Sequence, residues 1–351
     1  SGTYESAPDA YYSPRDCNIT KTFNIFMEHI LLYAIVPIIV VMLAGYISGK
    51  KGIFNGDNAK AFNKVVLDYA LPAALFVSIV DASREMLVRD IKLTIISTVG
   101  IMVCFMIVYY IYAYCFKKNT KADGAIMALV CGSPTIGFLG FAVLEPIFGT
   151  TPSVALVVAI VGIVVNAIGI PVGLSLLNSA NEKLKPLPAG QKKPSAWKPV
   201  IHALEQPVAW APILAVVWVI AGIPWPDWAS PSFDLIKGAN ASMAVFAAGV
   251  TLSAVKVNIN WQAVLGCILK LIMMPLLVLV LGLIFKMDPM NLKMLVVACA
   301  LPPAFSGIII ASEYDTYVAT STSSLALNVI LFIGFCPLWI WITDIALRMF
   351  A

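Results

Sequence analysis

Long apolar stretches separated by short polar segments dominate this chain. A helix needs about 20 mostly apolar residues to cross the hydrocarbon core of a bilayer. Ten stretches of roughly this length occur, at 24–48, 60–80, 91–116, 125–148, 153–177, 207–223, 232–253, 260–285, 293–312 and 317–349. They are continuous rather than alternating, and they are too long for barrel strands. The pattern therefore predicts an all-α integral membrane protein with ten transmembrane helices.

The composition agrees with a membrane protein. Of the 351 residues, 60% are hydrophobic and only 12% are charged, whereas a soluble domain carries about 25% charged residues. Lipid must therefore cover much of the apolar surface. The basic residues fall in short segments and form no stripe with interleaved aromatic residues, so no nucleic-acid partner is predicted.

The loop charges predict the orientation of the chain. With the N-terminus outside, the cytoplasmic loops carry most of the lysine and arginine, as the positive-inside rule requires. We therefore expect a multi-pass protein of the cell membrane with both termini on the extracellular or periplasmic side. Residues 178–206, rich in proline and charge, are expected to be a cytoplasmic linker. This linker follows an N-terminal segment (1–23) and a first five-helix repeat (24–177), and it precedes a second repeat (207–351).

An odd number of crossings in each half places the two halves in opposite orientations. Carriers built from inverted repeats have this arrangement. The halves also resemble each other weakly, because Leu-Pro-Ala-Ala-Leu-Phe at 71–76 has a counterpart in Ala-Ser-Met-Ala-Val-Phe at 241–246. The sequence therefore favours two inverted five-helix repeats.

Proline and glycine interrupt the fourth and ninth runs. The fourth contains Gly-Ser-Pro-Thr-Ile-Gly-Phe-Leu-Gly at 132–140, and the ninth contains Leu-Pro-Pro-Ala-Phe-Ser-Gly at 301–307. Proline lacks an amide donor, and glycine permits non-helical dihedral angles. A single kinked helix is common, but broken backbone in mid-membrane must be buried or line a wet cavity. Matching interruptions in both halves favour a binding site, where freed amides and helix N-termini hold an anionic group.

The charged residues inside apolar runs include Asp68, Glu145, Lys237 and Lys270. Each costs about 2.5–3.5 kcal/mol at a helix centre, so its presence calls for a reason. Lys270 lies deepest and could neutralise a bound carboxylate or pair with an acid such as Asp68. Lys237 begins the seventh run and could extend to the interface, whereas Glu145 is interpreted as interfacial.

Enzyme chemistry has little support in the sequence. The two histidines, His29 and His202, are far apart, and the cysteines form no C-x-x-C pair, so no zinc site or histidine triad is predicted. Asp68 and Asp344 are the one candidate pair for an intramembrane aspartyl protease, and their neighbours do not match a protease motif. We expect no enzyme and no cofactor.

Several short motifs, in this order and spacing, resemble the auxin efflux carrier family, whose bacterial branch includes malonate and malate carriers. The similarity extends from about residue 24 onward. The similar region is therefore longer than a typical single domain. The motifs are Leu71–Phe76, Pro134–Gly149, Trp210–Leu214 with Ala221–Ile223, Ile236–Lys237, Gly249–Ser253, Lys270 with Pro275, and Ala300–Tyr314.

The resemblance implies two inverted five-helix repeats in which helices four and nine are broken where they cross. It also implies a static scaffold, a moving crossover domain, organic-anion substrates and a homodimer. Two positions depart from the family pattern. Thr135 stands where relatives often have asparagine, and Ala142 stands where they often have a crossing proline.

We therefore expect a secondary active transporter of a small organic anion, with a dicarboxylate such as malonate or malate as the preferred substrate. The alternatives are an auxin-like or other monocarboxylate carrier, a sodium-coupled symporter of the same architecture, and a non-transporting membrane sensor. Asp68 is expected to couple H⁺ or Na⁺ to transport, or to hold a lysine. The residues expected to bind substrate are Pro134, Thr135, Gly137, Gly140, Pro302, Pro303, Ser306, Lys237 and Lys270.

Overall fold

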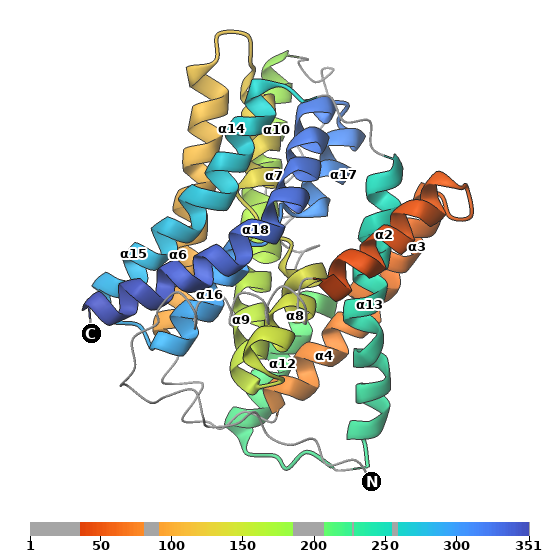
Figure 1. Cartoon of the computed structure of the whole chain (residues 1–351), viewed down its shortest axis with the longest axis vertical. Helices are drawn as coiled ribbons and strands as arrows, with labels where there is room; N and C mark the ends of the chain where they lie inside the picture. The colour runs from red at the N-terminus through yellow and green to blue at the C-terminus, as the bar shows by residue number, and fades with distance from the viewer. Residues whose placement is uncertain (1–35, 81–90, 185–206, 227, 255–258, 351) are drawn as a thin grey trace, which may run out of the picture.

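The computed structural model describes residues 36–80, 91–184, 207–226, 228–254 and 259–350 (Figure 1). These residues are helical and form no strand beyond one isolated bridge. Five helical segments are long and apolar enough to cross a membrane: Ile91–Cys115, Pro152–Ala180, Ser230–Ala254, Trp261–Ile284 and Val318–Phe350. Shorter apolar helices accompany them. The prediction of an all-α membrane protein is confirmed.

The helices follow the predicted apolar runs closely. The fifth run is longer than predicted, because its helix continues past residue 177 to Leu184. The remainder of the predicted linker and the N-terminal segment 1–23 lie outside the described residues. The α-helices are α2 (Val36–Lys50), α3 (Gly56–Val65), α4 (Leu71–Val80), α6 (Ile91–Tyr110), α7 (Lys121–Cys131), α8 (Ile136–Phe148), α9 (Pro152–Ile163), α10 (Ile170–Leu184), α12 (Pro207–Ala221), α13 (Ser230–Ala254), α14 (Trp261–Ile268), α15 (Met274–Ile284), α16 (Pro289–Ala300), α17 (Phe305–Glu313) and α18 (Val318–Phe350).

Several of these apolar helices contain a π-helical turn. The turns are η3 (Val66–Ala70), η4 (Ile111–Cys115), η5 (Val164–Gly169) and η6 (Leu269–Met273). Each carries a polar side chain in apolar surroundings: Asp68, Tyr112, Asn166 and Lys270. π-Helical turns are frequent at functional sites. The sequence pattern did not predict them.

The helices are apolar on their exposed faces as well as their buried ones. Along α6, the exposed residues Ile91, Ile95, Val99 and Val103 recur every four positions. The buried residues between them, such as Ile96 and Ile101, are equally apolar. A surface helix of a soluble protein would expose polar residues there. Lipid is the solvent that suits this face.

The helices form two packed groups (Figure 1). The scaffold group comprises α2, α3, α4, α12 and α13, where α2 packs against α13 and α4 against α12. The crossing group comprises α6 to α10 and α14 to α18, with α6, α14 and α15 on the side opposite α2 and α13. The groups meet where α13 contacts α8, and where α9 contacts α4 and α12.

Small residues bring α2 and α13 into backbone contact. A Cβ atom added to Gly45 would overlap the Phe246 carbonyl, and one added to Gly249 would overlap the Met42 carbonyl. Gly49 lies equally close to Ser253. Small residues spaced four apart permit such close approach in membranes, where van der Waals packing drives helix association.

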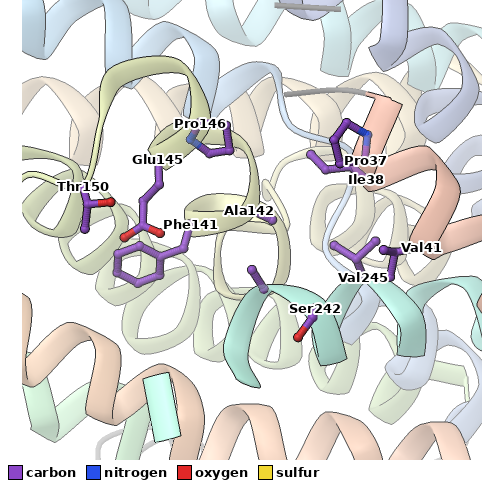
Figure 2. A pocket seen from close by; sticks show the side chains of 11 residues that line it. Pro37, Ile38, Val41, Phe141, Ala142, Glu145, Pro146, Thr150, Ser242 and Val245 are labelled. Atoms are coloured by element: carbon purple, nitrogen blue, oxygen red, sulfur yellow. The ribbon is translucent and has the colours of Figure 1, made fainter. Parts of the chain in front are cut away.

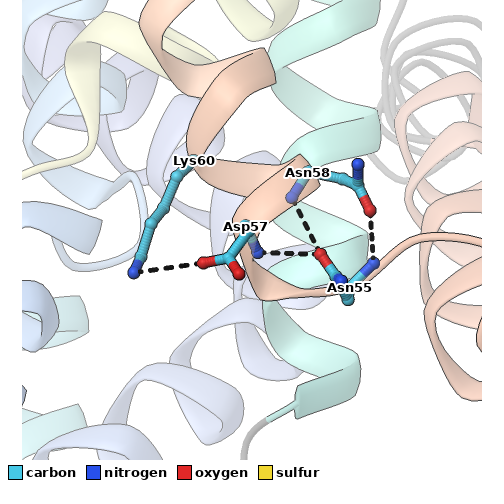
Figure 3. Close-up of polar contacts among 4 residues, drawn as sticks. All are labelled: Asn55, Asp57, Asn58 and Lys60. Atoms are coloured by element: carbon cyan, nitrogen blue, oxygen red, sulfur yellow. Dashed lines mark hydrogen bonds and ion pairs between the residues drawn. The ribbon is translucent and has the colours of Figure 1, made fainter.

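A capping box begins α3, which also packs on α13 (Figure 3). The Asn55 side-chain oxygen accepts hydrogen bonds from the Asp57 and Asn58 amides, both at 3.0 Å. The Asn58 side chain accepts one from the Asn55 amide at 3.0 Å. These bonds satisfy amides that have no partner within the helix. An exposed ion pair between Lys60 and Asp57, at 3.5 Å, lies beside the cap.

Candidate functional site

The two predicted interruptions are present, and they meet. α7 ends at Cys131 and α8 begins at Ile136, while α16 ends at Ala300 and α17 begins at Phe305. Between them, Pro134 and Pro303 form an antiparallel bridge. The Thr135 amide donates to the Pro302 carbonyl at 2.9 Å, and the Ala304 amide donates to the Ser133 carbonyl at 2.9 Å. We call residues 132–135 and 301–304 the crossing.

The prolines explain why the backbone pairs across the crossing. Pro134, Pro302 and Pro303 have no amide hydrogen, so they cannot continue the ladder of either helix. The remaining amides and carbonyls are buried and must find other partners. The reciprocal bonds between the two segments satisfy two donors and two acceptors at once. Interruption of only one helix would leave these groups unpaired.

The crossing leaves polar groups available to a ligand. The Ser133 and Thr135 hydroxyls are buried and have no hydrogen-bond partner among the described residues. Helices α8 and α17 begin there, and the first amides of a helix lack intrahelical partners. Helix N-termini carry a partial positive charge of roughly one half each. Hydroxyls and amides at such ends suit a carboxylate.

Lys270 lies fully buried on η6. Its ammonium donates to the Cys299 carbonyl at 2.7 Å, in the last turn of α16, and contacts the Met274 sulfur at 3.0 Å. Among the described residues no carboxylate forms an ion pair with it. The predicted pairing with Asp68 is therefore absent there, and Lys270 faces backbone instead.

A cavity of about 420 Å³ separates the two helix groups (Figure 2). Its walls come from α2, α8, α13 and the turn after α8. Most lining residues are apolar, with Glu145, Thr150 and Ser242 as the polar members. The full lining is Pro37, Ile38, Val41, Phe141, Ala142, Glu145, Pro146, Thr150, Ala241, Ser242 and Val245.

An ion pair joins the two groups beside this cavity. Lys237 of α13 and Glu145 of α8 lie 3.9 Å apart, and both side chains are about a quarter exposed. Glu145 therefore belongs to the cavity wall and to an ion pair, two features that its sequence position did not predict. The partner of Lys237 could not be predicted, because it comes from the other half of the chain.

The remaining predicted residues lie in different surroundings. Gly137 lies against Leu67 and Leu71 of the scaffold group. Gly140 lies against Val158 of α9. Ser306 is half-buried in the first turn of α17. Asp68 is half-buried on η3 and forms no ion pair with another described residue.

Several wall residues escaped prediction from the sequence. Phe141 and Ala142 of α8, and Ser242 of α13, line the cavity. Ser133 was visible in the interrupted motif, and its unpartnered hydroxyl marks it in the structure. The apolar wall residues carry no signal of their own, because lipid-facing and cavity-facing residues have the same composition.

The fold and the crossing define a multi-pass helical membrane protein with paired broken helices. Residues 30–340 match the family model described as membrane transport protein, so the chain belongs to this family. It is a membrane transporter. It is 50% identical over 316 residues to the uncharacterized transporter YfdV of Escherichia coli K12, covering 88% of this chain and 96% of the relative. It is also 22% identical over 314 residues to the uncharacterized transporter MJ1031 of Methanocaldococcus jannaschii, covering 87% and 96%.

Proposed function

We propose that the protein is a secondary active carrier of a small organic anion, which binds at the crossing and crosses the membrane by alternating access. The observation that carries this proposal is the meeting of two helix N-termini with two unpartnered hydroxyls. The partial charges of the four helix ends cancel approximately. Lys270 adds one positive charge nearby, so the crossing favours an anion.

An inverted-repeat architecture of ten helices is part of the proposal, and the helix contacts support it. α2 packs on α13 as α12 packs on α4. In the crossing group, α6 packs on α7 as α15 packs on α16, and α10 packs on α7 as α18 packs on α16. When the first five predicted helices are exchanged for the last five, each of these contacts becomes its counterpart. Such symmetry places substrate sites at the repeat interface.

The cavity supplies a route between the groups. It is bounded by the start of α2 and the end of α8, which are outward in the orientation that the loop charges predict. We propose that substrate enters here from the outside. Movement of α8 and the crossing relative to α2 and α13 would then close this route and open another toward the cytoplasm.

Two substrate classes fit different parts of this site. A dicarboxylate such as malonate or malate suits the positive crossing together with a second cation, and Lys237 is the candidate for that role. The cavity wall favours a second candidate, a monocarboxylate with an apolar body. Its described lining holds one carboxylate, two hydroxyl residues and otherwise apolar side chains, and apolar walls with few polar groups are typical of ligand sites.

Uptake of labelled carboxylates into proteoliposomes tests the proposal. We expect saturable uptake of one of the two substrate classes. A proton or sodium gradient across the membrane should accelerate this uptake in one orientation and not in the other. Replacement of Ala142 by tryptophan, which fills the cavity, should reduce this uptake at least tenfold in a protein that still unfolds cooperatively. Absence of saturable uptake of every small carboxylate, with the folded state verified, would refute the proposal that the substrate is a small organic anion.

A further inference from the structure

The broken ninth helix has a defect that the crossing does not repair. In an α-helix the carbonyl of one residue accepts from the amide four residues later. The position four residues after Cys299 is Pro303, which has no amide hydrogen. The Cys299 carbonyl therefore has no helical donor. It is also buried, and an unpaired buried carbonyl costs about 1–3 kcal/mol.

The ammonium of Lys270 occupies the place of the missing donor. Its 2.7 Å bond to the Cys299 carbonyl is a charge-assisted hydrogen bond from η6 to α16. The positive charge also lies at the C-terminal end of α16, where a helix carries partial negative charge. One side chain thus satisfies the orphan carbonyl and the helix end together.

The break in the fourth helix lacks this arrangement. There Pro134 removes the donor for Val130 in the same way. The residue that packs against that break is Phe105 of α6, whose Cα lies 2.8 Å from the position of a Cβ built on Gly132. The third and eighth predicted helices therefore place different residues beside corresponding breaks: Phe105 in one case and Lys270 in the other.

We propose that Lys270 is a positioning residue that substitutes for the amide absent at Pro303 and holds the end of α16 in place. Its role is directed to the protein backbone rather than to the carboxylate of a substrate. The geometry of the crossing then depends on this lysine whatever solute is carried, so the inference stands apart from the proposed transport activity.

Thiol reactivity measures the state of the α16 end directly. Cys299 is a buried free cysteine, and its alkylation by a membrane-permeant maleimide can be followed by mass spectrometry of its peptide. We expect Lys270→Met to raise the rate of Cys299 alkylation about tenfold, the factor that corresponds to loss of a charged hydrogen bond. Cys336 of α18, also buried and free, is the reference within the same molecule and should not change.

A matched control separates this role from general loss of a lysine. Lys92 is exposed and also donates from its ammonium to a carbonyl, that of Lys286, at 3.2 Å. No proline stands four residues after Lys286. Lys92→Met should therefore leave the alkylation of Cys299 unchanged.

The decisive variant combines Lys270→Met with Pro303→Ala. The second substitution supplies the backbone amide that Cys299 lacks, so the double variant should return Cys299 alkylation toward the wild-type rate. If Lys270 instead binds substrate, Lys270→Met leaves Cys299 protected, or Pro303→Ala gives no recovery. Either result overturns the proposal. If the Lys270→Met protein does not accumulate, the yield of the double variant is measured instead. A yield that recovers supports the proposal, and a yield that stays low overturns it.

Discussion

Helix α13 packs differently on its two sides. Against α2, the backbones approach so closely that Gly45 and Gly249 have no room for a Cβ atom. Against α8, the same helix borders a cavity of about 420 Å³ and forms an ion pair at 3.9 Å. One side is a dense backbone contact, and the other borders a mostly apolar cavity with one ion pair beside it.

The difference indicates which contact is permanent. Close packing gains many small dispersion contacts that any displacement would lose. A long ion pair beside a cavity can be broken and remade at little cost, because water can replace its partners. We therefore infer that α2 and α13 move as one body and that α8 moves against them.

The largest effect is expected on the dense side. Gly249→Ala should lower the free energy of unfolding by about 3 kcal/mol, because the added methyl group overlaps the backbone of α2. The control is Gly238→Ala in the same helix, where no atom lies within 4 Å of the added Cβ. It should be neutral or slightly stabilising, since alanine is the better helix former. Thermal unfolding in lipid nanodiscs gives both values, and equal effects would remove the distinction between the two sides.

An intermediate effect is expected at the ion pair on the open side. Lys237→Met and Glu145→Gln should each change the transport rate by about fivefold, with a coupling free energy of about 1 kcal/mol in the double variant. The control is the pair Lys293 and Asp344, which joins α16 to α18 within the crossing group. Lys293→Met with Asp344→Asn should alter stability without changing the transport rate. The same change in transport rate for both pairs would contradict a special role for the α8–α13 contact.

The smallest effects are expected at the α3 cap. Asn55→Ala removes the side-chain oxygen that accepts from the Asp57 and Asn58 amides, and it should cost about 1 kcal/mol of unfolding free energy. Lys60→Met breaks only the exposed ion pair and should change it by less than about 0.5 kcal/mol. Thermal unfolding of the two variants measures the difference. Since α3 lies on the scaffold group, neither variant should alter the KM.

The crossing shows how far the sequence could predict a site. Pro134, Pro302 and Pro303, together with the glycines near them, predicted both interruptions, because proline removes an amide donor and glycine permits non-helical dihedral angles. The expectation that the two breaks cross followed only from the resemblance to the carrier family. The partner of Lys270 could not be predicted, since the Cys299 carbonyl is a backbone group common to every residue. The sequence suggested an acidic side chain as the partner, because acidic residues can be recognised in a sequence and an unpaired carbonyl cannot.

The residues of the cavity wall, in contrast, could not be predicted from the sequence. In a soluble protein the period of the apolar residues identifies the buried face of each helix. Here lipid and protein interior are both apolar, so exposed Val99 and buried Ile101 look alike in the sequence. The wall residues on α2, α8 and α13 could not be distinguished from lipid-facing ones for this reason.

The sequence by itself determined the many membrane crossings and the two matching interruptions. These depend on local properties, namely the length of an apolar run and the absence of an amide on proline. Only the tertiary structure decided that the breaks pair with each other, that Lys270 faces a carbonyl, and that α13 is dense on one side and open on the other. Those outcomes depend on which surfaces meet, and a uniformly apolar helix carries no mark of the neighbour it will have.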